Sequence, residues 1–344
     1  MNAATLGIDI GKRFFHVVGL DEIGRVVFRE KLTREPLHQL FATHPKCVMA
    51  METCCGAQHL GRKASEHGHD VRLIPAQHVR PFVKSQKNDF NDATALAEVA
   101  RMPSMRAVPL RSIEQIDVQA FHRARQRLIE QRNGMTSQIR GLLLDRGVTI
   151  AQGLYPLRTA VPSILADADN QLTPAFRQLL ASLLAMFRQT EAALEELTEY
   201  LRGLGRESDT CRRLQTIPGI GPLVATALVS AVGNASAFRT SRDLSAWIGL
   251  VPRQHTTGGK PRLMGITKRG NTYLRRLFVQ GARALWVWKD KRNDPLHVWI
   301  RSLASRMHPH VAVCALANKL VRICWALLRH NEQVFLHDAA AQRV

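Results

Sequence analysis

The chain of 344 residues is longer than one typical domain and long enough for two or three, each with its own core. It contains 48 Lys and Arg residues against 28 Asp and Glu residues, which gives a formal charge of +20. This positive charge is spread along the chain instead of forming one tail, which favours a nucleic-acid partner. Six cysteines without a C-x-x-C pair argue against a zinc or disulfide framework. With no signal peptide and no run of 18 apolar residues, we expect a cytoplasmic protein that does not span a membrane.

The N-terminal part alternates apolar runs with turns and helical patterns. Apolar runs typical of strands occupy residues 5–10, 14–20, 26–28, 47–51 and 71–74. A hairpin turn at 21–24 predicts that the first three strands are antiparallel, and helical patterns at 57–67 and 91–100 follow the last two. Together these elements predict an α/β domain, a mixed sheet with flanking helices.

Long helical patterns dominate the middle of the chain. Residues 112–146 and 173–204 each have one apolar face, and Pro156 and Pro162 interrupt the region between them. Two long helices around a short irregular segment predict an antiparallel, coiled-coil-like arm. From about 211 to 328 the pattern is mostly α-helical, and the tail after 335 looks frayed. We expect an N-terminal domain at 1–108, the arm at 109–208, a C-terminal domain at 209–335 and a tail at 336–344.

Two acidic residues end predicted strands. Asp9 ends the first strand between two glycines, and Glu52 ends the fourth. If these strands are parallel neighbours about 5 Å apart, the two carboxylates emerge side by side at one edge of the sheet. An aspartate in an ordinary tight turn, or the first strand of a sugar-kinase or actin-like ATPase fold, would show the same local pattern. A strand-end glutamate is usually only solvated.

Two further acids, Asp89 and Asp92, precede a helical run. In the first helical turn they would share a face, with Cβ atoms about 5 to 6 Å apart. The alternative is that one of them simply caps the helix. Four clustered carboxylates repel one another until some protonate, unless a cation compensates the charge. Oxygen ligands suit Mg²⁺, and two such ions about 3.5 to 4 Å apart can serve phosphodiester chemistry.

The ordered set Asp9, Glu52, Asp89 and Asp92 resembles the DEDD acids of RuvC-like transposases from insertion sequences related to the Piv-type DNA invertases. The matching motifs are G-I-D-I-G-K, M-E-T and K-N-D-F-N-D-A, and the resemblance covers nearly the whole chain. It implies an RNase H-like (RuvC-like) N-terminal domain whose four acids bind Mg²⁺ and catalyse DNA cutting. In this family a structured noncoding RNA from the element's flanks can guide the choice of DNA, so a guide RNA is an implied partner.

The C-terminal half contains L-Q-T-I-P-G-I-G-P-L-V-A at 214–225, which reads as a helix, a glycine-bounded turn and a second helix. This resembles a helix-hairpin-helix element, in which glycine amides and the following helix N-terminus face a phosphate. We expect Gly219 and Gly221 to contact a nucleic-acid backbone. A tight helical hairpin that only packs is the alternative.

Downstream, residues 249–276 combine glycines and hydroxyls with basic residues and predict a flexible loop that binds a polyanionic backbone. The basic residues are Arg253, Lys260, Lys268, Arg269, Arg275 and Arg276. A merely solvated basic loop is the competing interpretation.

The segment P-R-Q-H-T-T-G-G-K resembles the second characteristic domain of the same family, in which a serine hydroxyl attacks DNA and holds it covalently. This chain has Thr256 and Thr257 there and no serine, and either threonine could supply the hydroxyl. His255 could orient or deprotonate it, or could simply lie beside DNA. The nearby Ser241 and Ser245 fall in a predicted helix, where capping or packing is expected.

Three functional hypotheses follow. The first is a transposase or site-specific DNA recombinase of an insertion sequence, with a composite site and long helices that support a homo-oligomer, a dimer or tetramer. The second is a RuvC-like structure-specific endonuclease, such as a junction resolvase, which hydrolyses DNA without a protein hydroxyl. The third is a nonenzymatic nucleic-acid-binding protein whose acids are structural.

Overall fold

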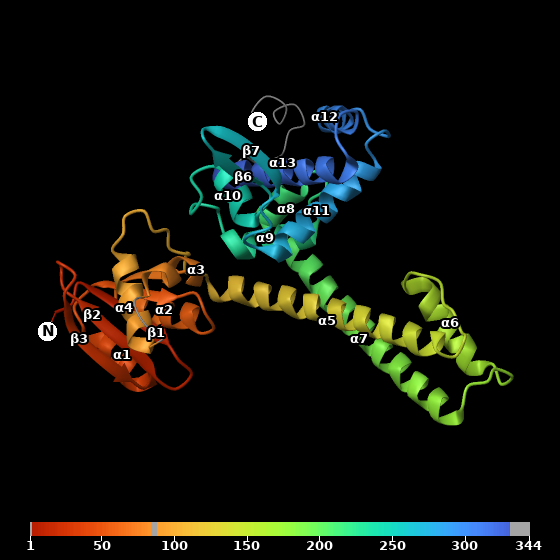
Figure 1. Cartoon of the computed structure of the whole chain (residues 1–344), viewed down its shortest axis with the longest axis horizontal. Coiled ribbons are helices and arrows are strands. Elements are labelled where there is room, and N and C mark those ends of the chain that lie inside the picture. Colours follow the sequence, from red (N-terminus) through yellow and green to blue (C-terminus); the bar gives the residue numbers. More distant parts are fainter. Residues whose placement is uncertain (1, 84–87, 331–344) are drawn as a thin grey trace. The chain divides into compact units, whose positions relative to one another are not determined.

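The computed structural model describes residues 2–83 and 88–330, and it forms two compact units, one ending at Ser112 and one beginning at Ile113 (Figure 1). The first unit ends close to the expected boundary at 108. The arm and the C-terminal helices belong to one compact unit, and their expected division at 208 stays a prediction. The predicted tail at 336–344 and the last residues of the predicted domain at 209–335 lie outside the described residues.

A five-stranded mixed sheet organises the first unit, in the order β3-β2-β1-β4-β5. Its strands are β1 (Thr5–Ile10), β2 (Phe15–Leu20), β3 (Val26–Leu32), β4 (Val48–Glu52) and β5 (Asp70–Ile74). The first three strands are antiparallel, whereas β1 pairs in parallel with β4, and β4 with β5. The predicted mixed sheet with its antiparallel start is therefore confirmed, as is the predicted parallel pairing of the first and fourth strands.

Helices cover both faces of this sheet, because its central strands are apolar on both sides. Two helices, α1 (Arg34–Thr43) and α2 (Ala57–Glu66), share one core with Leu6 and Ile8 of β1. On the opposite face α4 (Asp89–Ala100) buries its alanines against β2 and β4. The short helices α3 (Ala76–Val79) and η1 (Arg80–Phe82) lead from β5 toward α4.

Helix α4 lies directly on β1 at Gly7. A Cβ atom at Gly7 would come within 1.9 Å of the Ala93 carbonyl oxygen and 2.7 Å of the Ala97 amide nitrogen. Any side chain there would push the helix away from the sheet. Since side chains alternate along a strand, Asp9 shares this face with Gly7 and lies toward the N-terminal turn of α4.

The second unit contains the predicted antiparallel arm, formed by α5 (Ile113–Leu144) and α7 (Pro174–Glu207) (Figure 1). The end of α5 packs against the beginning of α7 in one apolar cluster. The expected irregular segment between them is wrong, because residues Leu154–Ala166 form the helix α6. Pro156 lies in its first turn, where an amide proton has no helical partner, and Pro162 is accommodated inside the helix.

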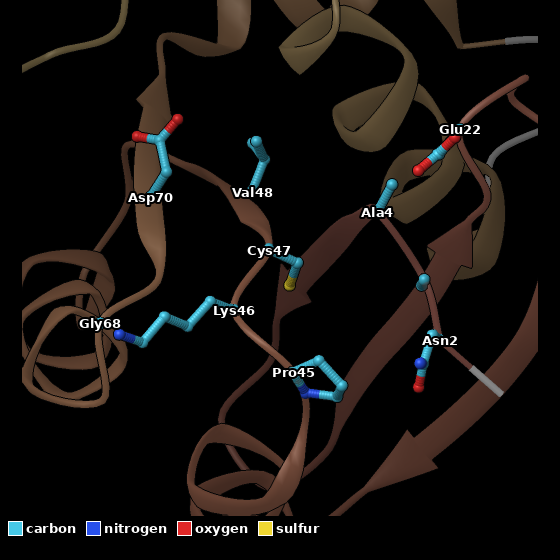
Figure 2. A pocket seen from close by; sticks show the side chains of 10 residues that line it. Asn2, Ala4, Glu22, Pro45, Lys46, Cys47, Val48, Gly68 and Asp70 are labelled. Carbon is cyan, nitrogen blue, oxygen red and sulfur yellow. The ribbon is translucent and has the colours of Figure 1, made fainter.

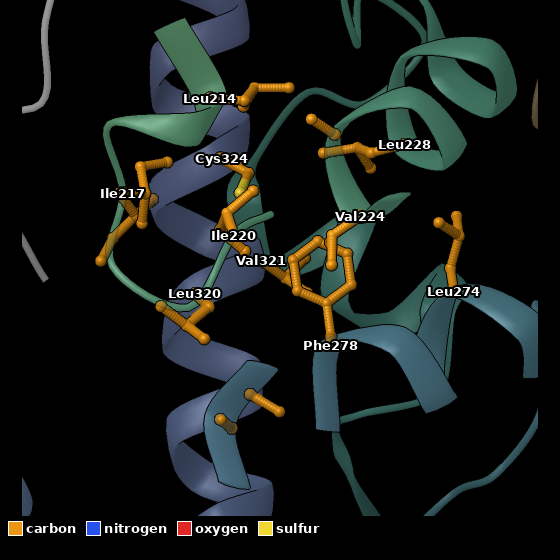
Figure 3. Close-up of a cluster of buried hydrophobic side chains, with 14 of the residues drawn as sticks. Leu214, Ile217, Ile220, Val224, Leu228, Leu274, Phe278, Leu320, Val321 and Cys324 are labelled. Carbon is orange, nitrogen blue, oxygen red and sulfur yellow. The ribbon is translucent and has the colours of Figure 1, made fainter. Parts of the chain in front are cut away.

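The remaining helices surround a second large core (Figure 3). They are α8 (Asp209–Gln215), α9 (Pro222–Val232), α10 (Ser241–Ile248), α11 (Thr272–Val287), α12 (Pro295–Ala304) and α13 (Pro309–His330). In the close-up, Val321 of α13 lies next to Phe278 and Val224, and the same helix contributes Leu320 and Cys324, so this helix is central to the core. The mostly α-helical C-terminal region is thus as predicted.

Among the described residues, α13 is the one helix whose length and composition would suffice to cross a membrane. Of its most apolar 18-residue window, 61% is buried inside the protein. A core helix passes the same test, and α13 contributes Leu316, Leu320 and Cys324 to the apolar core.

A buried polar network fastens the arm to the C-terminal helices. His122 of α5 is 3% exposed, with Nδ1 2.9 Å from the Tyr273 hydroxyl and Nε2 3.0 Å from Thr226 Oγ1. Thr226 donates its own proton to the Pro222 carbonyl, so it accepts from Nε2. The neutral ring with its proton on Nε2 satisfies every partner. Burial, and then the charge of Arg125, lower the pKa of His122 to about 4.

We expect this histidine to make the second unit sensitive to acid. Its pKa is about 4 when folded and about 6.5 when unfolded, so the unfolded chain binds the extra proton between these values. The free energy of unfolding should fall by up to about 1.4 kcal/mol per pH unit as the pH drops through this window. Urea unfolding at pH 7, 6 and 5 measures the slope. Other groups also titrate in this window, so the contribution of His122 is the difference between the slopes of the wild type and His122→Gln. That difference should approach the stated value, and the exposed His310→Gln should leave the slope unchanged; equal slopes in the wild type and His122→Gln contradict the prediction.

Candidate functional site

Two of the predicted acids lie at neighbouring strand ends. In the parallel register Ile8 of β1 is paired with Met51 of β4, so Asp9 and Glu52 follow at the same level. Ile8 and Met51 point into the core beneath α1 and α2. Asp9 and Glu52 therefore point to the opposite face, toward α4.

The other two acids lie in the first turn of α4. The helix cap is Asn88, whose side chain accepts a hydrogen bond from the Phe90 amide at 2.9 Å. The alternative that Asp89 or Asp92 caps the helix is therefore wrong. Both carboxylates lie at the positive end of the helix dipole, which favours negative charge there.

A histidine that sequence reasoning missed lies among these acids. His16 of β2 is paired with Asp9 across the antiparallel register, and its Nδ1 is 3.5 Å from Asp89 Oδ2. The Phe90 ring contacts the imidazole edge-on, with centroids 4.8 Å apart, and the His16 side chain is only 12% exposed. The hairpin register could have revealed it, since Thr5 opposite Leu20 puts His16 opposite Asp9.

The other three acids act electrostatically on Asp9. Partial burial, and then the charges of Asp89, Asp92 and Glu52, raise the pKa of Asp9 from 3.8 to about 6, whereas His16 opposes the rise. The same crowding reaches Cys54, whose thiol pKa is raised by burial and then by Glu52 and Asp9. Uncompensated negative charge is thus built into this end of the sheet.

This donor set fits a divalent cation. Three residues, Asp9, His16 and Asp89, each offer one ligand atom, and these three atoms lie within 4.8 Å of one another. Glu52 and Asp92 are outside that tight group, although both raise the pKa of Asp9. Carboxylate oxygens suit hard cations, and a cation would relieve the repulsion that raises the pKa of Asp9.

A pocket of about 510 Å³ in the first unit lies at the other end of the strands (Figure 2). Asn2, Lys46 and Asp70 line it, near the beginnings of β1, β4 and β5. Burial raises the pKa of Cys47 in its wall to about 11, which makes that thiol a poor nucleophile. None of the predicted site residues lines this pocket.

In the second unit, the glycine-bounded turn joins α8 to α9 in the predicted order. Gly219 has a φ of +82°, and a Cβ there would lie 2.9 Å from the carbonyl oxygen of Gly281 in α11. Gly219 is therefore required for close packing. A Cβ at Gly221 would meet no atom within 4 Å, which leaves the start of α9 open. Phosphate binding by these glycines stays a prediction.

The basic segment is not the flexible loop expected from its sequence. It forms an antiparallel ribbon of β6 (Pro252–Thr257) and β7 (Lys260–Ile266), exposed along nearly its whole length. Gly258 and Gly259 both have positive φ and supply the tight two-residue turn. Strands are predicted from alternating apolar residues. The exposed strands of the ribbon consist mainly of polar residues and lack that alternation, so the sequence did not predict them.

The ribbon separates the two candidate nucleophiles onto opposite faces. Thr257 pairs with Lys260 and His255 with Arg262, so these four side chains share one face. Thr256 is on the other face, where its Oγ1 accepts a hydrogen bond from Gln254 at 2.8 Å.

The other predicted residues around the ribbon differ in their exposure and in their hydrogen bonds. Arg253, Lys260, Lys268, Arg269 and Arg276 are exposed. Arg275 instead donates hydrogen bonds to the carbonyl oxygens of Ile248 and Arg269, so it holds the base of the ribbon. As predicted, Ser241 and Ser245 lie in a helix, and Ser245 is fully buried.

A mixed RNase H-like sheet with clustered acids, followed by a helical region with a basic ribbon, defines the class of DEDD transposases. Comparison with known proteins agrees. Residues 6–146 match the family model of IS110-type DEDD transposases, and residues 211–297 match that of the IS116/IS110/IS902 transposase family.

Curated relatives extend over almost the whole chain. The transposase for insertion sequence element IS1111A of Coxiella burnetii is 41% identical over 95% of this chain and 90% of its own length. A probable family 20 transposase of Pseudomonas aeruginosa and the transposase for IS1328 of Yersinia enterocolitica are each 40% identical, over 95% of this chain and 97% of their own lengths. The chain belongs to the IS116/IS110/IS902 family of insertion-sequence transposases, enzymes that cut and rejoin DNA.

We expect the acid cluster to lower stability when no cation is bound. The raised pKa of Asp9 means that its ionised form opposes folding at neutral pH, by roughly 1–3 kcal/mol. Asp9→Asn should therefore raise the melting temperature in EDTA, and Mg²⁺ should stabilise the wild type but not the variant. Glu35→Gln, an exposed acid on α1, is the control and should change neither value. Equal stabilisation of Asp9→Asn by Mg²⁺ would sink the assignment.

Proposed function

We propose that Asp9, Glu52, Asp89 and Asp92 bind Mg²⁺ and cut DNA, and that Thr257 supplies the hydroxyl that holds the cut strand. The observation that carries this proposal is the convergence of four acids and His16 at one end of the sheet, at which the pKa of Asp9 is raised to about 6. A bound divalent metal would neutralise charge on the phosphodiester as it is attacked. The carboxylates would hold that ion, and binding it would relieve their mutual repulsion.

Thr257 is the better candidate for the nucleophile. It shares its ribbon face with His255, Lys260 and Arg262, which offer a proton acceptor and two phosphate-binding cations. The hydroxyl of Thr256 is engaged by Gln254 on the other face. In the proposed step, the bond from Thr257 Oγ1 to phosphorus forms as a bridging P–O bond breaks. The threonine proton passes to His255, and the released deoxyribose oxygen takes up a proton.

Family membership supports the transposase over both alternatives. A junction resolvase would need no hydroxyl on the ribbon, and a nonenzymatic binding protein would need no acid cluster. We further propose, from the resemblance and the charge of +20, that a noncoding guide RNA binds this chain and that it works as a homo-oligomer, a dimer or tetramer. A cytoplasmic location is part of the same proposal.

Substitutions on the two faces of the ribbon test the nucleophile. Thr257→Ala should abolish plasmid recombination and the covalent protein–DNA adduct on a denaturing gel, a loss of at least about 100-fold, since the hydroxyl is the attacking group. Thr257→Ser should keep both activities, and Thr256→Ala, the matched control, should reduce them by less than about 3-fold. Cleavage and rejoining that survive Thr257→Ala contradict the role and favour hydrolysis.

Spectroscopy of bound Mn²⁺ tests whether His16 joins the acids as a ligand. Imidazole suits Mn²⁺ better than Mg²⁺, which prefers oxygen ligands. We expect pulsed electron paramagnetic resonance of the Mn²⁺-loaded chain to show coupling to a histidine nitrogen, absent in His16→Gln. Mn²⁺ affinity should also fall, by roughly 10-fold. Bound Mn²⁺ without nitrogen coupling would limit His16 to orienting Asp89. A failure of Mn²⁺ to bind the wild type would instead count against the metal site itself.

A further inference from the structure

A second pocket of about 510 Å³ lies within the C-terminal helices. It is formed by the turn before α9, the end of α11 and the beginning of α12, and the lining residues are Pro218, Gly219, Ala284, Leu285, Trp288, Lys291, Arg292 and His297. Pockets that bind small ligands have volumes of about 300–1,000 Å³. Apart from Gly219, no residue assigned above to cutting or binding DNA lines this pocket.

Two contacts fix the walls of this pocket before any ligand binds. Gly281 allows α11 to approach the turn so closely that a Cβ there would lie 2.2 Å from the Gly219 carbonyl oxygen. On the other side Arg301 of α12 donates hydrogen bonds to the carbonyl oxygens of Lys289 and Arg292, at 2.9 and 2.6 Å. The segment that carries the pocket's cations is thus already ordered, which lowers the entropy cost of binding.

The chemistry of the lining combines an aromatic face with positive charge. Trp288 is 52% exposed, and the Lys291 ammonium lies 4.5 Å from the centroid of its ring. Of the two nearby acids, Asp290 pairs with Lys289, whereas Asp294 pairs with His297 at the wall of the pocket. Within the described residues Lys291 and Arg292 form no ion pair, so the lining has two cations that are not neutralised by a direct partner.

His297 completes the lining. It is fully buried, and its Nδ1 is 2.7 Å from Asp294 Oδ2, which holds the first turn of α12. Its Nε2 is buried and has no hydrogen-bond partner among the described residues. A buried polar atom without a partner is costly.

We propose that this pocket binds an unpaired nucleotide of single-stranded nucleic acid, with the base stacked on Trp288 and the phosphate at Lys291 and Arg292. An exposed aromatic beside cations is how proteins bind single strands without reading a sequence. Bases in a duplex are already stacked and cannot reach the ring. The site requires neither metal nor the Thr257 hydroxyl, so it goes beyond the proposed cleavage function. An RNA loop and a displaced DNA strand share this chemistry.

Binding of short fluorescent oligonucleotides to the full chain tests the site. Single-stranded DNA, single-stranded RNA and duplex DNA, each with one 2-aminopurine, are titrated in EDTA so that cleavage plays no part. Stacking on Trp288 should quench the 2-aminopurine in both single strands but not in the duplex. Trp288→Ala should weaken single-strand binding by roughly 5- to 100-fold, the range of one base–aromatic stack, and Trp288→Phe by less.

Matched variants separate stacking from general charge and from misfolding. Val287→Ala changes the adjacent side chain of α11, which is 72% exposed and does not line the pocket, and it should leave binding unchanged. Lys291→Gln should reduce the log-log salt dependence of single-strand binding by about 0.7. Equal effects of Trp288→Ala and Val287→Ala, or an equal loss on the duplex, overturn the proposal. If single-stranded RNA binds more tightly than single-stranded DNA, the nucleotide in the pocket comes from RNA; the reverse order identifies DNA.

Discussion

The close approach of α4 to β1 is the contact on which the acid cluster of the first unit depends. Gly7 has no side chain, so the backbone of α4 at Ala93 and Ala97 lies directly on the strand. In α4, Asp92 directly precedes Ala93 and Asp89 lies one turn earlier, and two residues beyond Gly7 in β1 is Asp9. A residue with a side chain at position 7 would separate the helix from the sheet and move the acids of α4 away from those of the strands. The separation of the carboxylates is therefore determined by a backbone contact directly beside them in both elements.

This arrangement has an energetic cost that the rest of the unit offsets. Four acids at one end of a sheet destabilise the ionised form of Asp9, which is why its pKa is raised to about 6. Cores on both faces of the sheet hold the strands and α4 in place against that repulsion. The unit thus keeps an electrostatically strained cluster ready for a cation, as functional sites often do at the expense of stability.

The ribbon of the second unit combines exposed strands with a tightly packed base. An isolated two-stranded hairpin is marginal in water, and nearly all of β6 and β7 is exposed. Its base, however, is held firmly: a Cβ at Gly249 would meet the Arg269 carbonyl oxygen at 1.9 Å, and one at Gly270 would meet that of Trp247 at 1.9 Å. Rigid attachment at the base with an exposed, basic tip suits a segment that contacts a polyanion such as DNA.

Much of the first unit could be predicted because its strands are apolar, short and separated by turns. That periodicity is local, and it also located Asp9, Glu52 and the pair on α4. His16 was missed because its place depends on the register between two strands, which is set by the pairing of whole strands. The ribbon and α6 were missed for another reason. Their residues have only a weak intrinsic preference for strand or helix, and the neighbouring structure decides their conformation.

The order of residues along the chain was therefore enough to establish the class of fold, the set of acids and the family to which the chain belongs. Each of these depends on residue types and spacing that are present in the unfolded chain. Only the folded structure decided that Asn88 rather than an aspartate caps α4, that Thr256 and Thr257 face opposite ways, and that Trp288 lies exposed beside two cations. The contacts themselves join near neighbours, such as Asn88 with Phe90 and Thr257 with Lys260. Each forms only in the conformation and with the exposure that the packing of the whole chain gives its segment, and residue types and spacing alone do not determine these.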